Sequence, residues 1–145
     1  MEFDTVFNQI KDTKLVSSDC ELVVCQDAPS ASTYFWFGAI GAAISESSRE
    51  KSYYVLAFEN DTIYLFDIDI YKGAKTARYL GTVVQIPFSD IKRIGISTFI
   101  TKEINIITKQ KTSVRLLTSN KFMKFNQKDA VKKVFDALKL RRKNK

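Results

Sequence analysis

Two carboxylates, Asp67 and Asp69, have the residue type and spacing that come nearest to catalytic chemistry in this chain. They stand two positions apart in residues 62–69, an apolar run typical of a strand, so their side chains share one face. Such a pair can hold Mg²⁺ when a third acid converges on it. No further residue completes a recognisable metal or nuclease motif, and acidic residues on a solvated strand face are the plainer interpretation. The pair supports one alternative function, a small metal-dependent hydrolase.

The composition argues against most other catalytic chemistry. Histidine, the commonest general base and metal ligand, is absent from the 145 residues. Ser89 therefore has no imidazole to activate it, and it is better explained as turn chemistry before Asp90. Cys20 and Cys25 are too few for a disulfide scaffold or a four-ligand zinc site and are predicted to be free thiols. We expect a non-enzymatic protein with no catalytic residues, no metal and no cofactor.

Charge is distributed unevenly along the chain. Residues 1–70 carry 4 Lys/Arg against 12 Asp/Glu, a net −8, and residues 71–145 carry 19 against 4, a net +15. The whole chain has a net charge of +7. Such asymmetry either lets one half attract the other or marks a basic face for an anionic partner.

Two groups of basic residues form the candidate binding site. The first lies in a predicted loop of residues 72–78, and the second is a basic tail of residues 141–145. Neither has an acidic neighbour in sequence, and basic residues of this kind are attracted to anionic membrane surfaces. Charge in a loop or at a chain end can equally serve only solubility. The candidates are Lys72, Lys75, Arg78, Arg141, Arg142, Lys143 and Lys145.

Residues 34–44 are the most apolar run, in which aromatic residues lead into glycine and alanine. A buried helix or ordered loop is the plainer interpretation. The small surface around Gly38 and Gly41 would alternatively suit a homo-oligomer contact or a membrane-interface anchor. The run is far shorter than the roughly 20 residues that span a bilayer, so no integral membrane segment is predicted. The first residues also lack a secretory signal, which indicates a cytoplasmic protein, with peripheral membrane contact as an option.

The first third of the chain is predicted to be an extension packed on the main domain. Apolar residues at helical spacing predict a helix over residues 3–12, and residues 21–25 are typical of a strand. With the apolar run at 34–44, residues 1–52 form a helix/strand/helix extension. The domain itself is predicted to cover residues 53–140.

Short strands separated by turns fill most of that domain. A tight hairpin is predicted around Asn60 and Asp61, which tolerate positive φ. Pro87, which cannot donate to a central ladder, marks a corner between two later strands. The predicted strands cover residues 53–59, 62–69, 79–86, 90–100, 103–108, 113–118 and 121–125, seven in all.

One amphipathic helix closes the chain. Asn126 is predicted as its N-cap, with Asp129 completing a pair similar to a capping box. An apolar stripe follows at the spacing of one helix face, formed by Val131, Val134, Phe135 and Leu138.

Seven antiparallel strands followed by one such helix resemble a pleckstrin-homology-like domain. Residues 86–94, Ile-Pro-Phe-Ser-Asp-Ile-Lys-Arg-Ile, are similar to the corner found in small bacterial families of this kind, and so is the Gly/Ala-rich segment before the first hairpin. The resemblance implies two bent antiparallel sheets forming an open barrel, with the C-terminal helix at one end. Eukaryotic relatives that hold phosphoinositides carry basic residues in the first hairpin loop. Here that loop is Asn60-Asp61, so the phosphoinositide site is not implied.

The predicted function is a binding module that contacts either a protein partner or an anionic membrane surface, because this fold hosts several kinds of ligand. The metal-dependent hydrolase and a nucleic-acid accessory protein are the alternatives. Nucleic acid ranks behind the other partners because the aromatic residues of the basic half lie mostly in apolar strand context rather than on a stacking platform.

Overall fold

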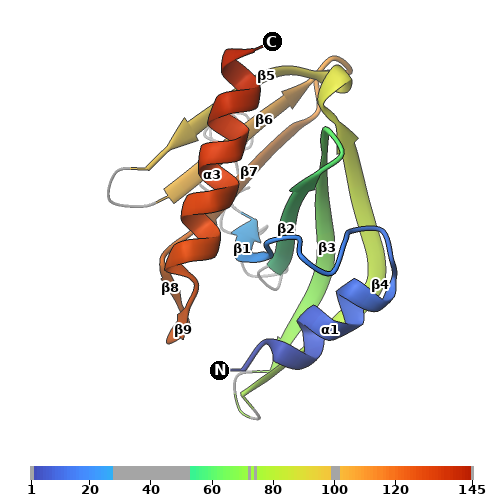
Figure 1. Cartoon of the computed structure of the whole chain (residues 1–145), viewed down its shortest axis with the longest axis vertical. Coiled ribbons are helices and arrows are strands. Elements are labelled where there is room, and N and C mark those ends of the chain that lie inside the picture. The colour runs from blue at the N-terminus through green and yellow to red at the C-terminus, as the bar shows by residue number, and fades with distance from the viewer. Residues whose placement is uncertain (1, 28–52, 72, 74, 99–101, 145) are drawn as a thin grey trace, which may run out of the picture.

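The computed structural model describes residues 2–27, 53–71, 73, 75–98 and 102–144 (Figure 1). Its helical elements are α1 (Asp4–Asp12), the short 3-10 helix η1 (Phe88–Asp90) and α3 (Lys128–Lys143). Its strands are β1 (Val23–Asp27), β2 (Tyr53–Glu59), β3 (Thr62–Tyr71), β4 (Thr76–Pro87), β5 (Ile91–Ser97), β6 (Lys102–Thr108), β7 (Ser113–Thr118), β8 (Lys121–Phe122) and β9 (Phe125–Asn126). The predicted class, mainly β with a C-terminal helix, is confirmed. The element predicted at residues 34–44 lies outside the described residues.

Seven strands pair into one antiparallel sheet in the order β4-β3-β2-β1-β7-β6-β5. The sheet has seven strands, as the predicted barrel does, but its membership and grouping differ from the prediction in two ways. Residues 121–125, predicted as the seventh strand, instead form the separate hairpin β8-β9, whose turn holds Met123 and Lys124 at positive φ. The seven strands from β1 to β7 also form one sheet rather than two, and the edge strands β4 and β5 of that sheet do not pair with each other.

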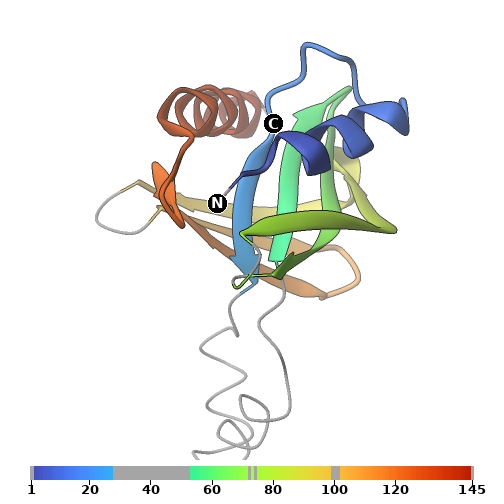
Figure 2. The ribbon, with the colours of Figure 1, turned by 90° about the horizontal axis from the view of Figure 1, so that it is seen from below.

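The seventh member of the sheet is β1, which comes from the predicted N-terminal extension. It lies between β2 and β7, with Val24 opposite Val55 and Gln26 opposite Leu117. Residues 23–27 therefore supply the central strand of the sheet that residues 53–118 otherwise build. Figure 2 shows β1 passing between the half of the sheet that carries α1 and the half that carries α3.

Two local predictions are confirmed. Asn60 and Asp61 join β2 to β3 as a two-residue turn with φ of 54° and 56°, the conformation that suits a tight hairpin. Pro87 ends β4, and η1 then turns the chain into β5. Phe88, in this corner, is only 1% exposed, so the corner is anchored by a buried ring.

The core consists of two apolar clusters on opposite faces of the sheet, because alternate residues of a strand point to opposite sides. Val23 belongs to the first cluster and Val24 to the second. α3 contributes the predicted stripe, Val131, Val134, Phe135 and Leu138, to the first cluster, and all four are buried. α1 contributes Val6 and Ile10 to the second cluster, where they cover the outer face of β2, β3 and β4.

The start of α3 differs from the prediction by one position. The N-cap is Gln127 rather than Asn126, and its side chain makes no capping hydrogen bond. Asn126 instead accepts a hydrogen bond from the backbone N–H of Lys128 at 3.1 Å, so it satisfies one free donor of the first turn from just outside the helix. The Gln127 side chain points into the protein, where it is 4% exposed.

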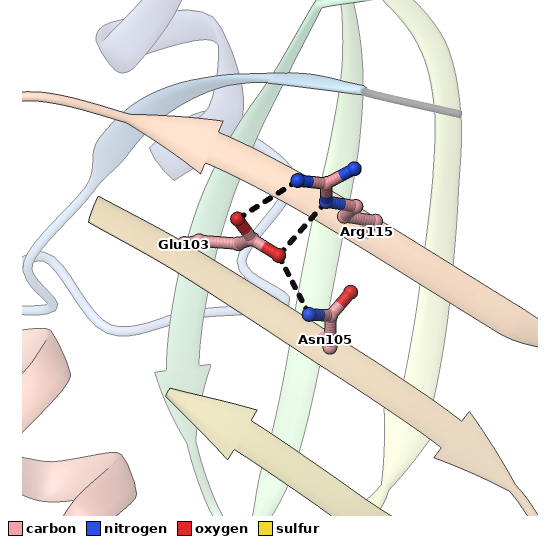
Figure 3. A network of polar contacts seen from close by, with 3 residues as sticks. All are labelled: Glu103, Asn105 and Arg115. Atoms are coloured by element: carbon pink, nitrogen blue, oxygen red, sulfur yellow. Dashed lines mark hydrogen bonds and ion pairs between the residues drawn. The ribbon is translucent and has the colours of Figure 1, made fainter. Parts of the chain in front are cut away.

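A polar network joins β6 and β7 on the sheet (Figure 3). Glu103 accepts hydrogen bonds from the guanidinium of Arg115 at 2.8 and 3.1 Å and from the amide of Asn105 at 2.6 Å. Both charged side chains are less than one-third exposed. The Arg115 hydrogen bond is the main reason that the pKa of Glu103 lies below its ordinary value, although partial burial opposes it.

This network makes stability depend on pH. Because the pKa of Glu103 is lower in the folded chain, its contribution is complete above the ordinary glutamate pKa and is lost as the pH falls through the lowered value. Glu103→Gln is expected to cost about 1 kcal/mol at neutral pH and less at pH 3. Urea unfolding at both pH values measures the difference. Asp19→Asn, at an exposed position, is the control; equal loss for Glu103→Gln at both pH values would contradict the prediction.

Candidate binding surfaces

The first predicted basic group is only partly a loop. Lys72 lies outside the described residues, and Lys75 is exposed just before β4. Arg78 lies on β4 itself, opposite Asp69 in the register, with its guanidinium 5.7 Å from the centroid of the Tyr71 ring. Opposite charges facing each other across paired strands attract. Asp69, which the sequence alone did not place beside Arg78, therefore offsets part of the positive charge of this group.

The second basic group is the last turn of a helix rather than a tail. Arg141 donates hydrogen bonds to both carboxylate oxygens of Asp61, and its guanidinium lies 4.6 Å from the centroid of the Phe88 ring. The hydrogen bond from Arg141 is the main reason that the pKa of Asp61 is lowered. Arg141 therefore joins the end of α3 to the β2-β3 turn and the η1 corner. Arg142 and Lys143 are exposed, and Lys145 lies outside the described residues.

The two groups do not form one surface. Asp61, which binds Arg141, directly precedes β3, whereas Tyr71, which contacts Arg78, ends that strand. A strand of ten residues is about 30 Å long. Figure 1 likewise places the C-terminal end of α3 and the C-terminal end of β3 at opposite ends of the molecule. The described residues of the two groups, Lys75 and Arg78 in one and Arg141, Arg142 and Lys143 in the other, therefore do not form a single flat membrane-binding patch.

Asp67 and Asp69 lie on β3 as predicted, and neither is fully exposed. Burial, and secondarily the charge of Asp69, raises the pKa of Asp67. The hydrolase alternative needs a third acid at this point. Within residues 2–27, 53–71, 73, 75–98 and 102–144, no three potential metal ligands come together.

The two cysteines are free, as the sequence predicted, and the structure shows that both are buried. They belong to different clusters, Cys25 to the first and Cys20 to the second. Burial, followed by the nearby charge of Glu59, raises the pKa of Cys20 to about 12. Burial also raises the pKa of Cys25. Both thiols are therefore protonated at neutral pH and poorly nucleophilic.

A groove that the sequence did not predict runs beside α3. Its volume is about 280 Å³, and the buried side chains of Val131 and Phe135 line it. Thr98 and Lys102, at the end of β5 and the start of β6, form the opposite wall together with Asn120. The charged residues that line the groove are Lys102, Lys128, Lys132, Lys139 and Asp136.

The charge of the groove is strongly one-sided. Four lysines face one carboxylate, and that carboxylate is already paired, because Lys132 donates a hydrogen bond to Asp136 at 2.9 Å. Among the described residues, the Lys102 ammonium donates a hydrogen bond to the backbone carbonyl of Thr98 at 3.4 Å. The groove therefore combines an apolar floor with basic walls, an arrangement that fits an anionic ligand with apolar parts.

Part of this groove could have been found from sequence. Lys128, Lys132 and Lys139 recur at four- and seven-residue steps, which places them on one side of the predicted helix, next to Phe135. Lys102 could not have been found, because only the pairing of β6 with β5 and β7 brings it to that side.

None of the described helices is long and apolar enough to cross a membrane. Comparison with family models, with curated proteins and with solved structures gave no match.

Proposed function

We propose that this protein is a non-enzymatic binding module of pleckstrin-homology-like architecture, and that it holds an acidic, extended segment of a partner protein in the groove beside α3. The observation that carries the proposal is the set of four lysines around an apolar floor, opposed by a single carboxylate that is already paired.

The architecture supports the fold assignment. The family was suggested from sequence by seven strands followed by one amphipathic helix and by the corner at residues 86–94. A seven-stranded antiparallel sheet with the C-terminal helix packed on its apolar cluster supports that assignment. Two features set this chain apart from the expected pattern. The central strand β1 precedes the hairpin β2-β3, and the sheet is open between β4 and β5.

The dimensions of the groove favour a short extended segment. From Lys128 to Lys139 the helix rises by about 17 Å, which matches about five residues of extended peptide. Carboxylates on such a segment would pair with the lysines, and its apolar side chains would contact Val131 and Phe135. A flat membrane fits less well, because the apolar floor is recessed and the predicted basic groups lie about 30 Å apart.

The test uses fluorescence polarisation with a labelled peptide of about eight residues, in which Asp and Glu alternate with Leu. Lys102→Glu combined with Lys139→Glu is expected to weaken binding by about tenfold or more, because two attractive contacts become repulsive. The matched control is Lys75→Glu combined with Arg78→Glu. It changes the net charge by the same amount, near the start of β4, at residues that do not line the groove. This control is expected to bind as the wild type does.

Three outcomes would overturn the proposal. Equal weakening by both double variants would mean that only net charge matters. No binding of the acidic peptide at any salt concentration would remove the ligand class. Sedimentation of the wild type with phosphatidylserine vesicles, abolished by the Lys75/Arg78 variant alone, would favour the membrane surface instead.

A further inference from the structure

The outer edge of β4 is unusual for this chain because it carries no charge. The nine residues from Tyr79 to Pro87 include no Asp, Glu, Lys or Arg, although 27% of the whole chain is charged. Two large apolar side chains on this edge strand are exposed, Leu80 at 44% and Val84 at 45%. Exposed edge strands normally carry charges that prevent pairing with another chain. This stretch carries no such charge.

The protein covers only the first part of the edge. The backbone N–H of Tyr79 donates a hydrogen bond to the side chain of Gln9 in α1, at 3.0 Å. Beyond Tyr79, β4 pairs on one side with β3, and no described residue pairs with its other side. The uncovered edge therefore begins at Leu80, the first of the two exposed apolar residues.

The same stretch is weakly held by its own sheet. Tyr79 of β4 lies opposite Ile68 of β3, and Val83 lies opposite Phe66. The chain therefore takes four residue steps on β4 where β3 takes two. Leu80, Gly81 and Thr82 therefore have no register partner on β3, and Gly81 adopts a φ of 87° at this bulge. Backbone groups at the bulge are left with fewer partners than those of a regular strand.

We propose that β4 pairs with β4 of a second copy of this chain, antiparallel and around a two-fold axis. An antiparallel strand can pair with itself, so one strand supplies both sides of the interface. A second copy is the partner that the residue spacing favours, because the two exposed apolar side chains lie two residues on either side of Thr82. The absence of charge in this stretch also limits the repulsion between two chains of net charge +7. Leu80 lies opposite the second copy's Val84 when the axis passes through Thr82, and both exposed apolar side chains are then covered.

The first experiment measures the molar mass by sedimentation velocity over a range of protein concentrations. The wild type is expected to shift from monomer to dimer as the concentration rises, and Val84→Lys is expected to remain a monomer. Ser113→Lys, which adds the same charge at an exposed position on β7, is the control and should dimerise as the wild type does. A wild type that stays monomeric, or a Val84→Lys variant that dimerises equally, overturns the proposal.

The second experiment tests the register without adding charge. Residues that face each other across an antiparallel pair have Cα atoms about 4.5–5.5 Å apart, within the range of a disulfide. Thr82→Cys is therefore expected to form a covalent dimer under mild oxidation, whereas Ser97→Cys, on the other edge strand, should not. The native thiols do not interfere, because both are buried. Equal cross-linking of the two variants would refute the pairing, whatever the outcome of the groove experiment.

Discussion

Replacing Phe135 by alanine is expected to lower the free energy of unfolding by about 3–5 kcal/mol. The ring is 2% exposed and belongs to the cluster that joins α3 to the inner face of the sheet. Its removal takes apolar contacts from both elements and leaves a cavity that the surrounding strands cannot fully close. A loss of this size is a large part of the roughly 5–15 kcal/mol that typically stabilises a domain.

Urea unfolding followed by far-UV circular dichroism measures this loss. The control is Leu140→Ala on the same helix, where the side chain is 63% exposed and the change is expected to be within about 0.5 kcal/mol. Similar unfolding midpoints for Phe135→Ala and the wild type would mean that α3 contributes little to holding the sheet.

The elements that could be predicted from sequence are those whose cause is local. The stripe Val131, Val134, Phe135 and Leu138 follows from helix periodicity, and all four residues are buried. The Asn60-Asp61 turn follows from residues that tolerate positive φ, and both adopt it. The corner after Pro87 follows from the missing N–H of proline.

Features that depend on distant contacts could not be predicted. β1 is short and pairs with β7 through Gln26 and Leu117, which are far apart in sequence. Residues 121–125 look like a strand but turn at Met123 and Lys124, non-glycine residues held at positive φ, which composition does not indicate.

The candidate site was misjudged for the same reason. Arg141 looked free because its partner Asp61 is 80 residues away in sequence. Arg78 was predicted to lie in a loop because the apolar run begins at Tyr79. The strand β4 begins before that run, at Thr76, and its pairing with β3 places Arg78 opposite Asp69. The groove lysines of α3 were visible as charges on a helix, but the position of Lys102 in the groove depends on the pairing of β6 within the sheet.

Gln127 is the clearest case of a residue whose role only the fold reveals. At Val24 the central strand β1 extends beyond the part that pairs with β7, which begins at Gln26. The Gln127 side chain takes the place of the missing strand: its amide oxygen accepts from the Val24 N–H at 2.8 Å, and its amide nitrogen donates to the Val24 carbonyl at 3.0 Å. The same nitrogen also lies within hydrogen-bonding distance of Thr118 Oγ1 and the Ser119 carbonyl.

Gln127→Leu is therefore expected to destabilise the protein by about 2–4 kcal/mol, although leucine is of similar size and more apolar. The Val24 N–H would be left buried with no acceptor, and an unsatisfied buried donor costs about 1–3 kcal/mol before the lost donations to Val24 and Ser119 are counted. The Val24 carbonyl would keep one partner, the hydroxyl of Thr118 at 2.6 Å. The strand should therefore loosen at its N–H rather than detach.

Urea unfolding gives the size of the effect, and hydrogen exchange gives its location. The amide of Val24 is expected to exchange much faster in Gln127→Leu, while the amide of Leu56, which belongs to the β2 side of the same strand pair, changes only with global stability. Gln110→Leu, the same substitution at an exposed position of the β6-β7 turn, should change stability by no more than about 0.5 kcal/mol. If Gln127→Leu were as stable as the wild type, with an unchanged Val24 amide, the Gln127 side chain could not be what completes the edge of β1.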